Sequence, residues 1–211
     1  MMSSPFFLDL PGTGLLGIRK LVEEADDLLH FLTPDTEDLN VLHSIRNESR
    51  RQEWLGVRVL VKEMLNREEK ISYLPSGKPV IIDESLFISV AHCKGTIAVL
   101  LSEKSEVGID IEHLSDRIER IVHKFMSPAE MEAICPQQRI RHLYLHWCAK
   151  EAIVKLLDRK NLIFENEIFI KPFVPEEKGN FGALVKTDTD EFDIRLHYMD
   201  YEDFVVVWAY K

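Results

Sequence analysis

The alternation of hydrophobic and polar residues is most regular in the second half of the chain, at 107–112. Apolar and acidic residues alternate there, which predicts a strand with Ile109 and Ile111 on one face and Asp110 and Glu112 on the other. The first face belongs in a hydrophobic core. The second carries two carboxylates side by side.

A second segment, 147–155, has the spacing of a helix. Trp147, Glu151 and Lys155 recur every four residues and therefore share one helical face. If that face meets the acidic face of the strand, three carboxylates converge beside one lysine. Like charges about 4 Å apart repel by roughly 4 kcal/mol at an effective dielectric of about 20, so the cluster would favour a hard divalent cation such as Mg²⁺. The alternative is a solvated edge strand and an ordinary pair between Glu151 and Lys155.

A weaker repetition relates the two halves of the chain. Trp, Val and Lys stay in step when 54–62 is aligned with 147–155, and two predicted strands follow each helical segment. These strands are 86–91 with 96–101, and 192–196 with 204–209. We therefore expect an α+β fold of two similar α/β lobes, 1–104 and 105–211, related by pseudo-twofold symmetry. The polar segment 102–106 would be the hinge, and the active site would lie in the cleft between the lobes.

Short signals mark the ends of further elements. Ser127, Pro128 and Glu130 have the spacing of a capping box with proline in the first turn, so a helix should begin at 128. The sequence Gly-Lys-Pro at 77–79 marks an exposed loop after a short strand at 70–74.

Basic residues gather on one face of another helix, predicted to begin at Asp116. Arg117, Arg120 and Lys124 line that face, and apolar residues line the opposite one. This face is either the solvated back of a core helix or a docking surface for an acidic partner. The pattern leaves both interpretations open.

Composition limits the partners and the compartment. The 211 residues are 45% hydrophobic and 29% charged, as in an ordinary globular protein, and the net charge of −10 argues against nucleic acid as the main partner. Three scattered cysteines favour a reducing compartment over a disulfide framework. We recognise neither a signal peptide nor a long apolar run, and expect a cytoplasmic protein that does not associate with membranes.

Together, the segments 107–112 and 147–155 resemble the paired signature of the 4′-phosphopantetheinyl transferases. The helical member of that pair is typically W-(S/C/T)-x-K-E-(A/S)-x-x-K, and every fixed position is filled. Weaker blocks agree in order at Arg50/Arg51 to Arg58, at 77–79 and at 89–92, so the resemblance runs from about 46 to 157. The two-lobed length is similar to the surfactin-synthetase-activating type of this family.

The resemblance implies a reaction. A member of this family transfers the 4′-phosphopantetheine arm of coenzyme A to a serine of an apo acyl or peptidyl carrier protein, with Mg²⁺, and releases 3′,5′-ADP. Asp110, Glu112 and Glu151 would ligate the metal, Glu112 either directly or through water. Lys155 would contact a phosphate, and Glu151 or a bound water would act as general base.

The family pattern also implies contacts to the nucleotide end of coenzyme A. Lys78 matches a lysine near the adenine, and His92 matches a histidine at the 3′-phosphate. Arg51 and Arg58 lie seven residues apart, share a helix face and could reach phosphates. Ala and Cys flank His92 where many relatives have serines, and this departure removes one phosphate donor.

Other functions remain open from the sequence. One is a Mg²⁺-dependent hydrolase that cleaves pyrophosphate with water, and the other is an inactive regulatory protein that binds coenzyme A. The intact set of acidic residues and Lys155 favours the transferase. Carriers of fatty-acid, polyketide and nonribosomal-peptide biosynthesis are all compatible with it. We expect a monomer that docks its carrier through Arg117, Arg120 and Lys124.

Overall fold

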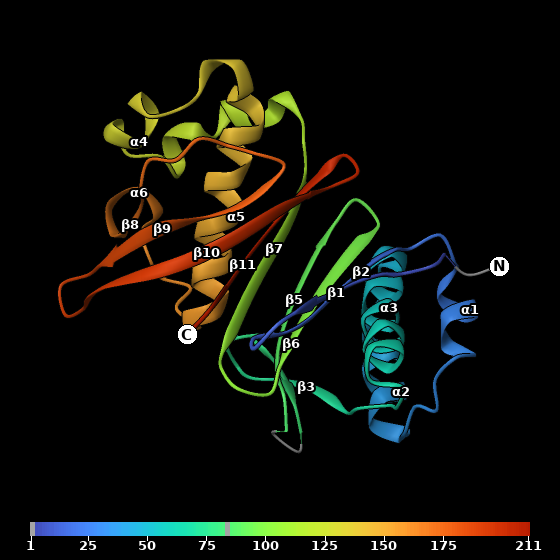
Figure 1. Ribbon diagram of the computed structural model, residues 1–211. Coiled ribbons are helices and arrows are strands. Elements are labelled where there is room, and N and C mark those ends of the chain that lie inside the picture. Colours follow the sequence, from blue (N-terminus) through green and yellow to red (C-terminus); the bar gives the residue numbers. More distant parts are fainter. Residues whose placement is uncertain (1–2, 83–84) are drawn as a thin grey trace. The chain divides into compact units, whose positions relative to one another are not determined.

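Two antiparallel sheets, each packed against one long helix, account for most of the chain (Figure 1). The computed structural model describes residues 3–82 and 85–211. The chain divides into an N-terminal unit, Met1–Lys104, and a C-terminal unit, Ser105–Lys211. The division falls inside the polar segment 102–106. The α+β class expected from the sequence is therefore the class of the structure.

The N-terminal unit contains a four-stranded sheet in the order β1-β2-β6-β5. Helix α3 (Glu48–Leu65) packs on this sheet and buries Val57, Leu60 and Val61 against it. The remaining elements are β1 (Phe6–Leu10), β2 (Gly14–Lys20), α1 (Ala25–Leu29), α2 (Thr36–Ser44), β3 (Ile71–Tyr73), β4 (Pro79–Ile81), β5 (Phe87–Cys93) and β6 (Thr96–Ser102). Strands β3 and β4 form a separate hairpin.

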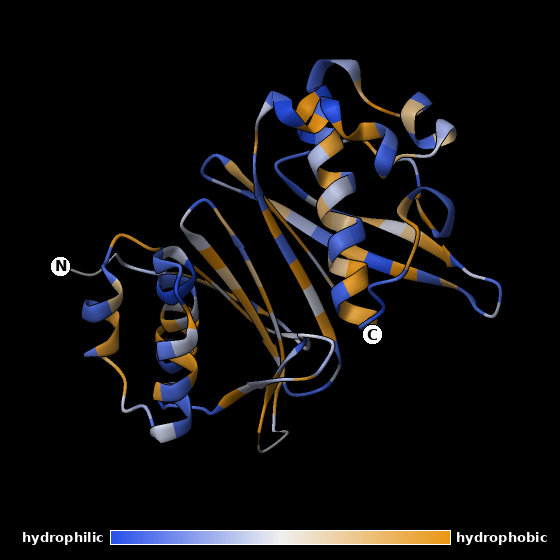
Figure 2. Cartoon of the chain, turned by 180° about the vertical axis from the view of Figure 1, so that it is seen from behind, coloured by the Kyte–Doolittle hydropathy of each residue, from blue (hydrophilic) through white to orange (hydrophobic). Residues whose placement is uncertain are grey.

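The C-terminal unit contains a five-stranded sheet in the order β7-β11-β10-β9-β8, covered by helix α5 (Arg139–Leu157). The strands are β7 (Val107–His113), β8 (Ile168–Ile170), β9 (Lys178–Lys186), β10 (Glu191–Tyr201) and β11 (Phe204–Tyr210). Shorter helical segments are η1 (Asp116–Arg120), η2 (Val122–Lys124), α4 (Pro128–Glu132), η3 (Pro136–Gln138) and α6 (Phe164–Glu167). Figure 2 shows hydrophobic positions recurring along the strands and along both long helices.

A glycine sets how closely α5 lies on β7. A Cβ atom added at Gly108 would collide with the carbonyl oxygen of Ala152 and would stand 2.7 Å from the amide nitrogen of Leu156. Gly108 therefore faces the helix. Because side chains two apart in a strand share a face, Asp110 and Glu112 face the helix as well.

Most predicted elements are present. The helices around 54–62 and 147–155 and the strands at 86–91, 96–101, 107–112, 192–196 and 204–209 are confirmed with small shifts of their ends. The capping box is confirmed too, with Ser127 Oγ accepting from the amide of Glu130 and the Glu130 carboxylate accepting from the amide of Ser127.

One predicted helix is wrong. The segment after Asp116 forms the two short 3₁₀ helices η1 and η2 in place of one α-helix. The residue before it, Ser115, makes no capping hydrogen bond, so the first turn lacks the support that an α-helix start needs. Arg117, Arg120 and Lys124 are exposed, but no continuous α-helical face carries them. In addition, no helix among residues 3–82 and 85–211 is long and apolar enough to cross a membrane.

Candidate functional site

The acidic face of β7 meets one face of α5 in the C-terminal unit. The Nζ atom of Lys155 donates to Asp110 Oδ1 at 2.8 Å and to the carbonyl oxygen of Ile109 at 2.9 Å. The side chain of Asp110 is only 11% exposed, against 30% for Lys155. The convergence expected from the two motifs therefore exists for this pair. We refer to Asp110, Glu112, Glu151 and Lys155 as the carboxylate site.

Glu151 lies in surroundings that disfavour its charge. Burial raises the pKa of the Glu151 carboxyl, and the neighbouring charges of Asp110 and Glu112 raise it further, while Lys155 lowers it in part. Three carboxylates thus influence one another across the strand and the helix, with one ammonium among them. Such an arrangement prepares Glu151 to hold a proton more readily than an exposed glutamate does.

The donor chemistry of this site fits a hard divalent cation. Asp110 Oδ2 is buried and has no hydrogen-bond partner among residues 3–82 and 85–211, and the mutual repulsion of the carboxylates is the kind that a cation relieves. In the described part of the chain, however, no three His, Cys, Asp or Glu side chains are grouped closely enough to hold a metal. The lysine ammonium occupies Asp110 Oδ1 instead.

A buried thiol lies behind the carboxylates. Cys148 on α5 is 0% exposed, and burial raises the pKa of its thiol well above the usual value, with the charges of Asp110 and Glu112 adding to the rise. A protonated, inaccessible thiol is no nucleophile. Cys148 is therefore a packing residue.

A second group of polar side chains lines a pocket of about 430 Å³ in the N-terminal unit. An Nη1 atom of Arg50 donates to His92 Nε2 at 2.7 Å and to Glu53 Oε2 at 2.8 Å. Because a guanidinium only donates, Nε2 of His92 is the acceptor and its ring proton sits on Nδ1, which lies 3.6 Å from Glu53 Oε1. Apolar side chains complete the wall, namely Ile45, Trp54, Val57, Tyr73, Pro79 and Val90.

The structure places Arg51 and Arg58 away from this Arg50–His92 pocket. Arg58 is 9% exposed, stacks on the Trp54 ring at 3.2 Å and donates to the carbonyl oxygen of Ile71 at 2.9 Å. The guanidinium nitrogens of Arg51 lie 3.8 Å from Asp26 Oδ1 and 3.5 Å from Glu48 Oε2. Arg58 thus holds α3 against β3, and neither arginine lines the pocket.

The Gly-Lys-Pro loop forms the turn of the β3–β4 hairpin. Gly77 has a φ of +87°, which explains the glycine, and its amide donates to the carbonyl oxygen of Leu74. Gly77 and Pro79 both line the Arg50–His92 pocket, and Lys78 stands between them. The structure therefore brings the loop and His92 to the same pocket.

Arg50 and Glu53 are the residues that the sequence reasoning missed. Arg50 and Arg51 are adjacent in the sequence, but Arg51 lies seven residues before Arg58, and this spacing favoured Arg51 as the candidate phosphate ligand. The signal was available, because positions 50, 54 and 57 also share a helix face, and Trp54 and Val57 are the apolar residues on it. When an arginine is followed, one turn later on the same helix face, by apolar residues, the pattern predicts that it lies at the rim of a pocket.

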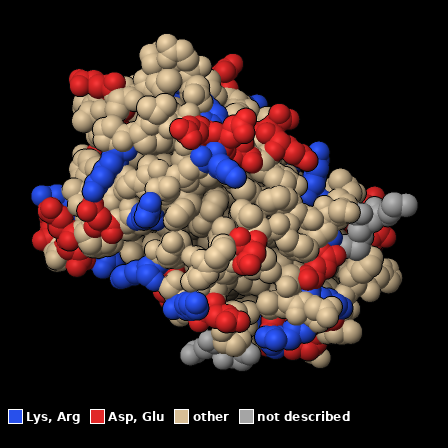
Figure 3. Space-filling view, in the orientation of Figure 1, with Lys and Arg blue, Asp and Glu red and all other residues tan. Residues whose placement is uncertain are grey.

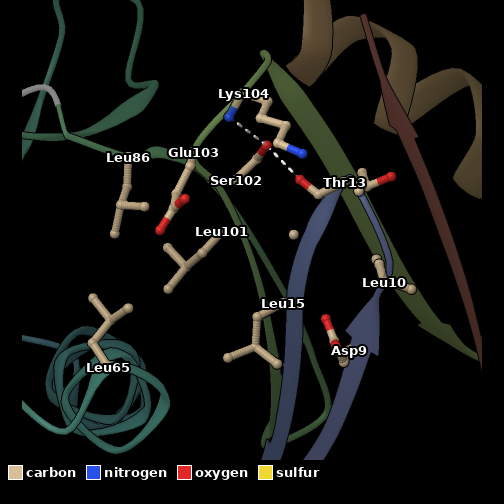
Figure 4. Close-up of a pocket in the computed structure, with 12 residues that line it drawn as sticks. Asp9, Leu10, Thr13, Leu15, Leu65, Leu86, Leu101, Ser102, Glu103 and Lys104 are labelled. Atoms are coloured by element: carbon tan, nitrogen blue, oxygen red, sulfur yellow. Dashed lines mark hydrogen bonds between the residues drawn. The ribbon is translucent and has the colours of Figure 1, made fainter.

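Another pocket of the N-terminal unit, about 450 Å³, contains none of the predicted site residues (Figure 4). Leucines of β2, β6 and the end of α3 form its floor, and Ser102 Oγ, which donates to the carbonyl oxygen of Thr13, closes one side. Asp9 and Glu103 supply the carboxylates at its edge. It offers neither a cluster of converging cations nor a nucleophile.

Charged side chains are dispersed over the surface. On the face shown in Figure 3, Lys and Arg are interspersed with Asp and Glu, and neither sign covers an extended area.

Comparisons with known proteins point to one family. The family model described as the 4′-phosphopantetheinyl transferase superfamily matches residues 106–209, almost the whole C-terminal unit. A 4′-phosphopantetheinyl transferase AcpT of Escherichia coli O157:H7 is 37% identical over 112 residues, which are 50% of this chain and 57% of the relative. The AcpT of Salmonella typhimurium is 38% identical over 112 residues, 50% of this chain and 58% of the relative. The match thus spans little more than half the length of these relatives.

Proposed function

Because the chain belongs to the 4′-phosphopantetheinyl transferase superfamily through its C-terminal unit, we propose that it transfers 4′-phosphopantetheine from coenzyme A to a carrier protein. The serine oxygen of an apo acyl or peptidyl carrier would attack the phosphorus that bears the pantetheine arm. The phosphoanhydride bond breaks, 3′,5′-ADP leaves with the bond's electron pair, and the serine proton passes to a base in the site.

The observation that carries this proposal is the meeting of Asp110, Glu151 and Lys155 between β7 and α5. The 2.8 Å ion pair between Lys155 and Asp110 supports a shared site for the two motifs, and the raised pKa of Glu151, due to burial and then to the charge of Asp110, supports its place there. A phosphoanhydride carries several negative charges. A site for its cleavage needs cations for the phosphates and a base for the hydroxyl, and these residue types supply both.

Each residue of the carboxylate site has a role in this proposal. Lys155 would leave Asp110 Oδ1 for a phosphate oxygen, and Asp110 and Glu151 would hold Mg²⁺, with Glu112 binding directly or through water. The metal would neutralise charge on the phosphates. Glu151 is the proposed base, because its raised pKa brings it nearer to the pH of the cell. A water held by Glu112 is the other base that the site offers.

The Arg50–His92 pocket is proposed for the nucleotide end of coenzyme A. Its apolar walls suit a flat base, and Arg50 and His92 at its rim suit a phosphate. Lys78 on the hairpin turn would complete this set. Since Arg50 lines the pocket and Arg51 and Arg58 do not, we assign the phosphate contact to Arg50 in their place.

The partners follow from the reaction. Coenzyme A is the donor, and the acceptor is a carrier protein that would dock at the exposed Arg117, Arg120 and Lys124. Action as a monomer in the cytoplasm stays a prediction.

Incubation of the protein with coenzyme A, MgCl₂ and a panel of apo carriers tests the proposal. A carrier mass gain of one phosphopantetheine group, together with release of 3′,5′-ADP, is the expected result. Cleavage of coenzyme A without modification of any carrier would establish the hydrolase instead. Binding of coenzyme A without cleavage would establish the regulatory protein. Asp110→Ala serves as the inactive control.

A further inference from the structure

Lys150 is the most deeply buried charged side chain next to the carboxylate site. It is 0% exposed and stands in the chain directly before Glu151. Its Nζ atom donates to the carbonyl oxygens of Phe125 and Phe164 at 2.6 and 2.8 Å, and to Glu130 Oε2 at 2.9 Å. An ammonium has three donors, and all three are used. No donor of Lys150 is left for a substrate.

The acceptors of Lys150 come from three separate segments. Phe125 follows η2, Glu130 lies in α4, and Phe164 begins α6. Glu130, which is 4% exposed, also accepts from the amides of Ser127 and Ile170, so β8 joins the same network. One side chain thus connects α5 to four neighbouring elements of the C-terminal unit.

Trp147, one turn earlier on α5, packs against two of the same segments. Its ring lies edge-on to the rings of Phe125 and Phe164, with centroids 5.4 and 5.8 Å apart. Positions 147 and 150 are three apart and share a face of α5. One face of α5 is therefore fixed by ring contacts at Trp147 and by hydrogen bonds at Lys150.

Successive residues of an α-helix point about 100° apart, so a fixed direction at one position fixes the others. We propose that Lys150 is a positioning residue, which fixes the rotation of α5 about its axis and thereby directs Glu151 and Lys155 at Asp110 on β7. The inference rests on the proposed function in that the side chains it directs are those assigned to the reaction. An apolar residue at 150 would leave two carbonyl oxygens and a carboxylate buried without donors, and the helix would turn or shift to hydrate them.

Lys150→Met tests this inference, because methionine keeps the length of the side chain and removes its donors. Arg141→Met is the matched control. Arg141 also ties α5 to a neighbour through an ion pair, with Asp200 at 2.9 Å, but nearly three turns before Glu151. Both variants lose a charged anchor of the same helix. Unfolding temperature, kcat and the KM for coenzyme A are measured for each, with ¹⁹F NMR of protein that contains fluorotryptophan.

The expected result is a split between the two variants. Lys150→Met should lower kcat roughly ten- to a hundred-fold and shift the resonance of Trp147, with those of Trp54 and Trp208 unchanged. Arg141→Met should lose stability and keep kcat within about two-fold of the parent. Equal loss of kcat at matched stability, or an unmoved Trp147 resonance in folded Lys150→Met, would overturn the inference.

Glu130→Gln covers the case in which Lys150→Met does not fold. This variant keeps both carbonyl acceptors of Lys150 and removes the ion pair, so the same changes should follow at smaller size; an unmoved Trp147 resonance and an unchanged kcat would overturn the inference. If the parent protein modifies no carrier, the proposed function fails, but the Trp147 resonance still decides whether Lys150 sets the rotation of α5.

Discussion

At the scale of single residues, the environment of Glu151 has the clearest consequence. The folded protein raises the pKa of this carboxyl, chiefly by burial and then by Asp110. A raised pKa means that ionised Glu151 is less stable in the fold than in the unfolded chain. Its contribution to stability is therefore present at low pH, below its unfolded pKa, and is lost as the pH rises through the folded value.

Glu151→Gln should separate activity from stability. We expect kcat for carrier modification to fall by about 10² to 10⁴, because a general base and metal ligand is lost. The unfolding temperature at neutral pH should not fall, because glutamine removes a charge that the site disfavours. Calorimetry and a carrier mass assay measure both effects. Loss of stability with retained activity would contradict both assignments, and Glu132→Gln, at a residue outside the site on α4, is the control.

At the same scale, the sequence predicted the carboxylate site better than the pocket. Asp110, Glu151 and Lys155 follow simple periods of two and four within single elements, so their faces could be derived. Arg50 and His92 meet between α3 and β5; the helix face of Arg50 can be read from its apolar neighbours, but nothing local shows that His92 of β5 lies against it. Arg58 illustrates this limit of sequence-based prediction. It donates to a carbonyl oxygen of β3, and because every residue type has a backbone carbonyl, the sequence does not mark this acceptor.

At the scale of elements, the contact of β7 with α5 depends on Gly108. A Cβ atom there would collide with the carbonyl oxygen of Ala152, which belongs to helix backbone and has no rotamer to change. The helix would have to move away from the strand. Because Asp110 lies two residues further along the same face, such a shift would separate it from Lys155.

Gly108→Ala should therefore impair both stability and activity. Overpacking of this kind costs about 1 to 3 kcal/mol, measurable by urea unfolding, and transfer activity should fall at least as much as in Lys155→Ala. Gly182→Ala is the matched control, since an added Cβ in β9 meets only the flexible side chain of Lys171 at 3.0 Å. Equal behaviour of the two glycine variants would show that close packing at Gly108 is unimportant.

Charge reversal in the 3₁₀ segments η1 and η2 tests the hypothesis that the carrier protein docks there. Arg117→Glu with Arg120→Glu should raise the KM for an acidic carrier roughly ten-fold and leave the KM for coenzyme A unchanged. Lys178→Glu with Lys186→Glu on β9 changes the net charge equally and is the control. If both double variants raise the KM alike, only the overall charge matters and the segment is a solvated surface.

The elements that the sequence did not predict share a physical cause. Strand β1 reads Phe-Phe-Leu-Asp-Leu, which is apolar at nearly every position, and β8 is short, so neither sequence shows a strong alternation of apolar and polar residues. The 3₁₀ segments replace an expected α-helix because their apolar residues suit either form. Only packing against α5, as at the buried Ile118 and Phe125, selects between them.

At the scale of the whole molecule, sensitivity to acid should differ between the two units. His142 and His146 are buried in the C-terminal unit, with ring centroids 4.8 Å apart, and Phe173 packs on both. Burial lowers the pKa of each to about 4. The histidines of the N-terminal unit, His30, His43 and His92, are exposed.

A histidine whose pKa is lowered by folding is protonated first in the unfolded chain. Its contribution to stability is present above pH 6.5 and is lost as the pH falls toward 4. Between pH 7 and pH 5 we expect a loss on the order of 2 kcal/mol per histidine. Urea unfolding reports this loss through fluorescence of the C-terminal tryptophans, in a Trp54→Phe background. His146→Leu should have a shallower pH dependence, and an unchanged slope would contradict the assignment.

A two-unit organisation was expected because a repetition of helix and hairpin is visible in the sequence, and the structure divides between Lys104 and Ser105. The roles of the units could not be derived from that repetition. Position 58 aligns with Glu151, but Arg58 is a buried structural contact, so equivalent positions carry unrelated tasks.

The buried Cys148 has a consequence for the chemistry of the product. Phosphopantetheine ends in a free thiol, and an accessible thiolate beside the reacting groups would capture any oxidised carrier as a mixed disulfide. Cys148 is fully buried and stays protonated, so it cannot exchange. In the proposed transferase, a cysteine can therefore stand two turns before Lys155 in a site that would deliver thiols. Such a site would release its product under mildly oxidising conditions without becoming covalently blocked at this position.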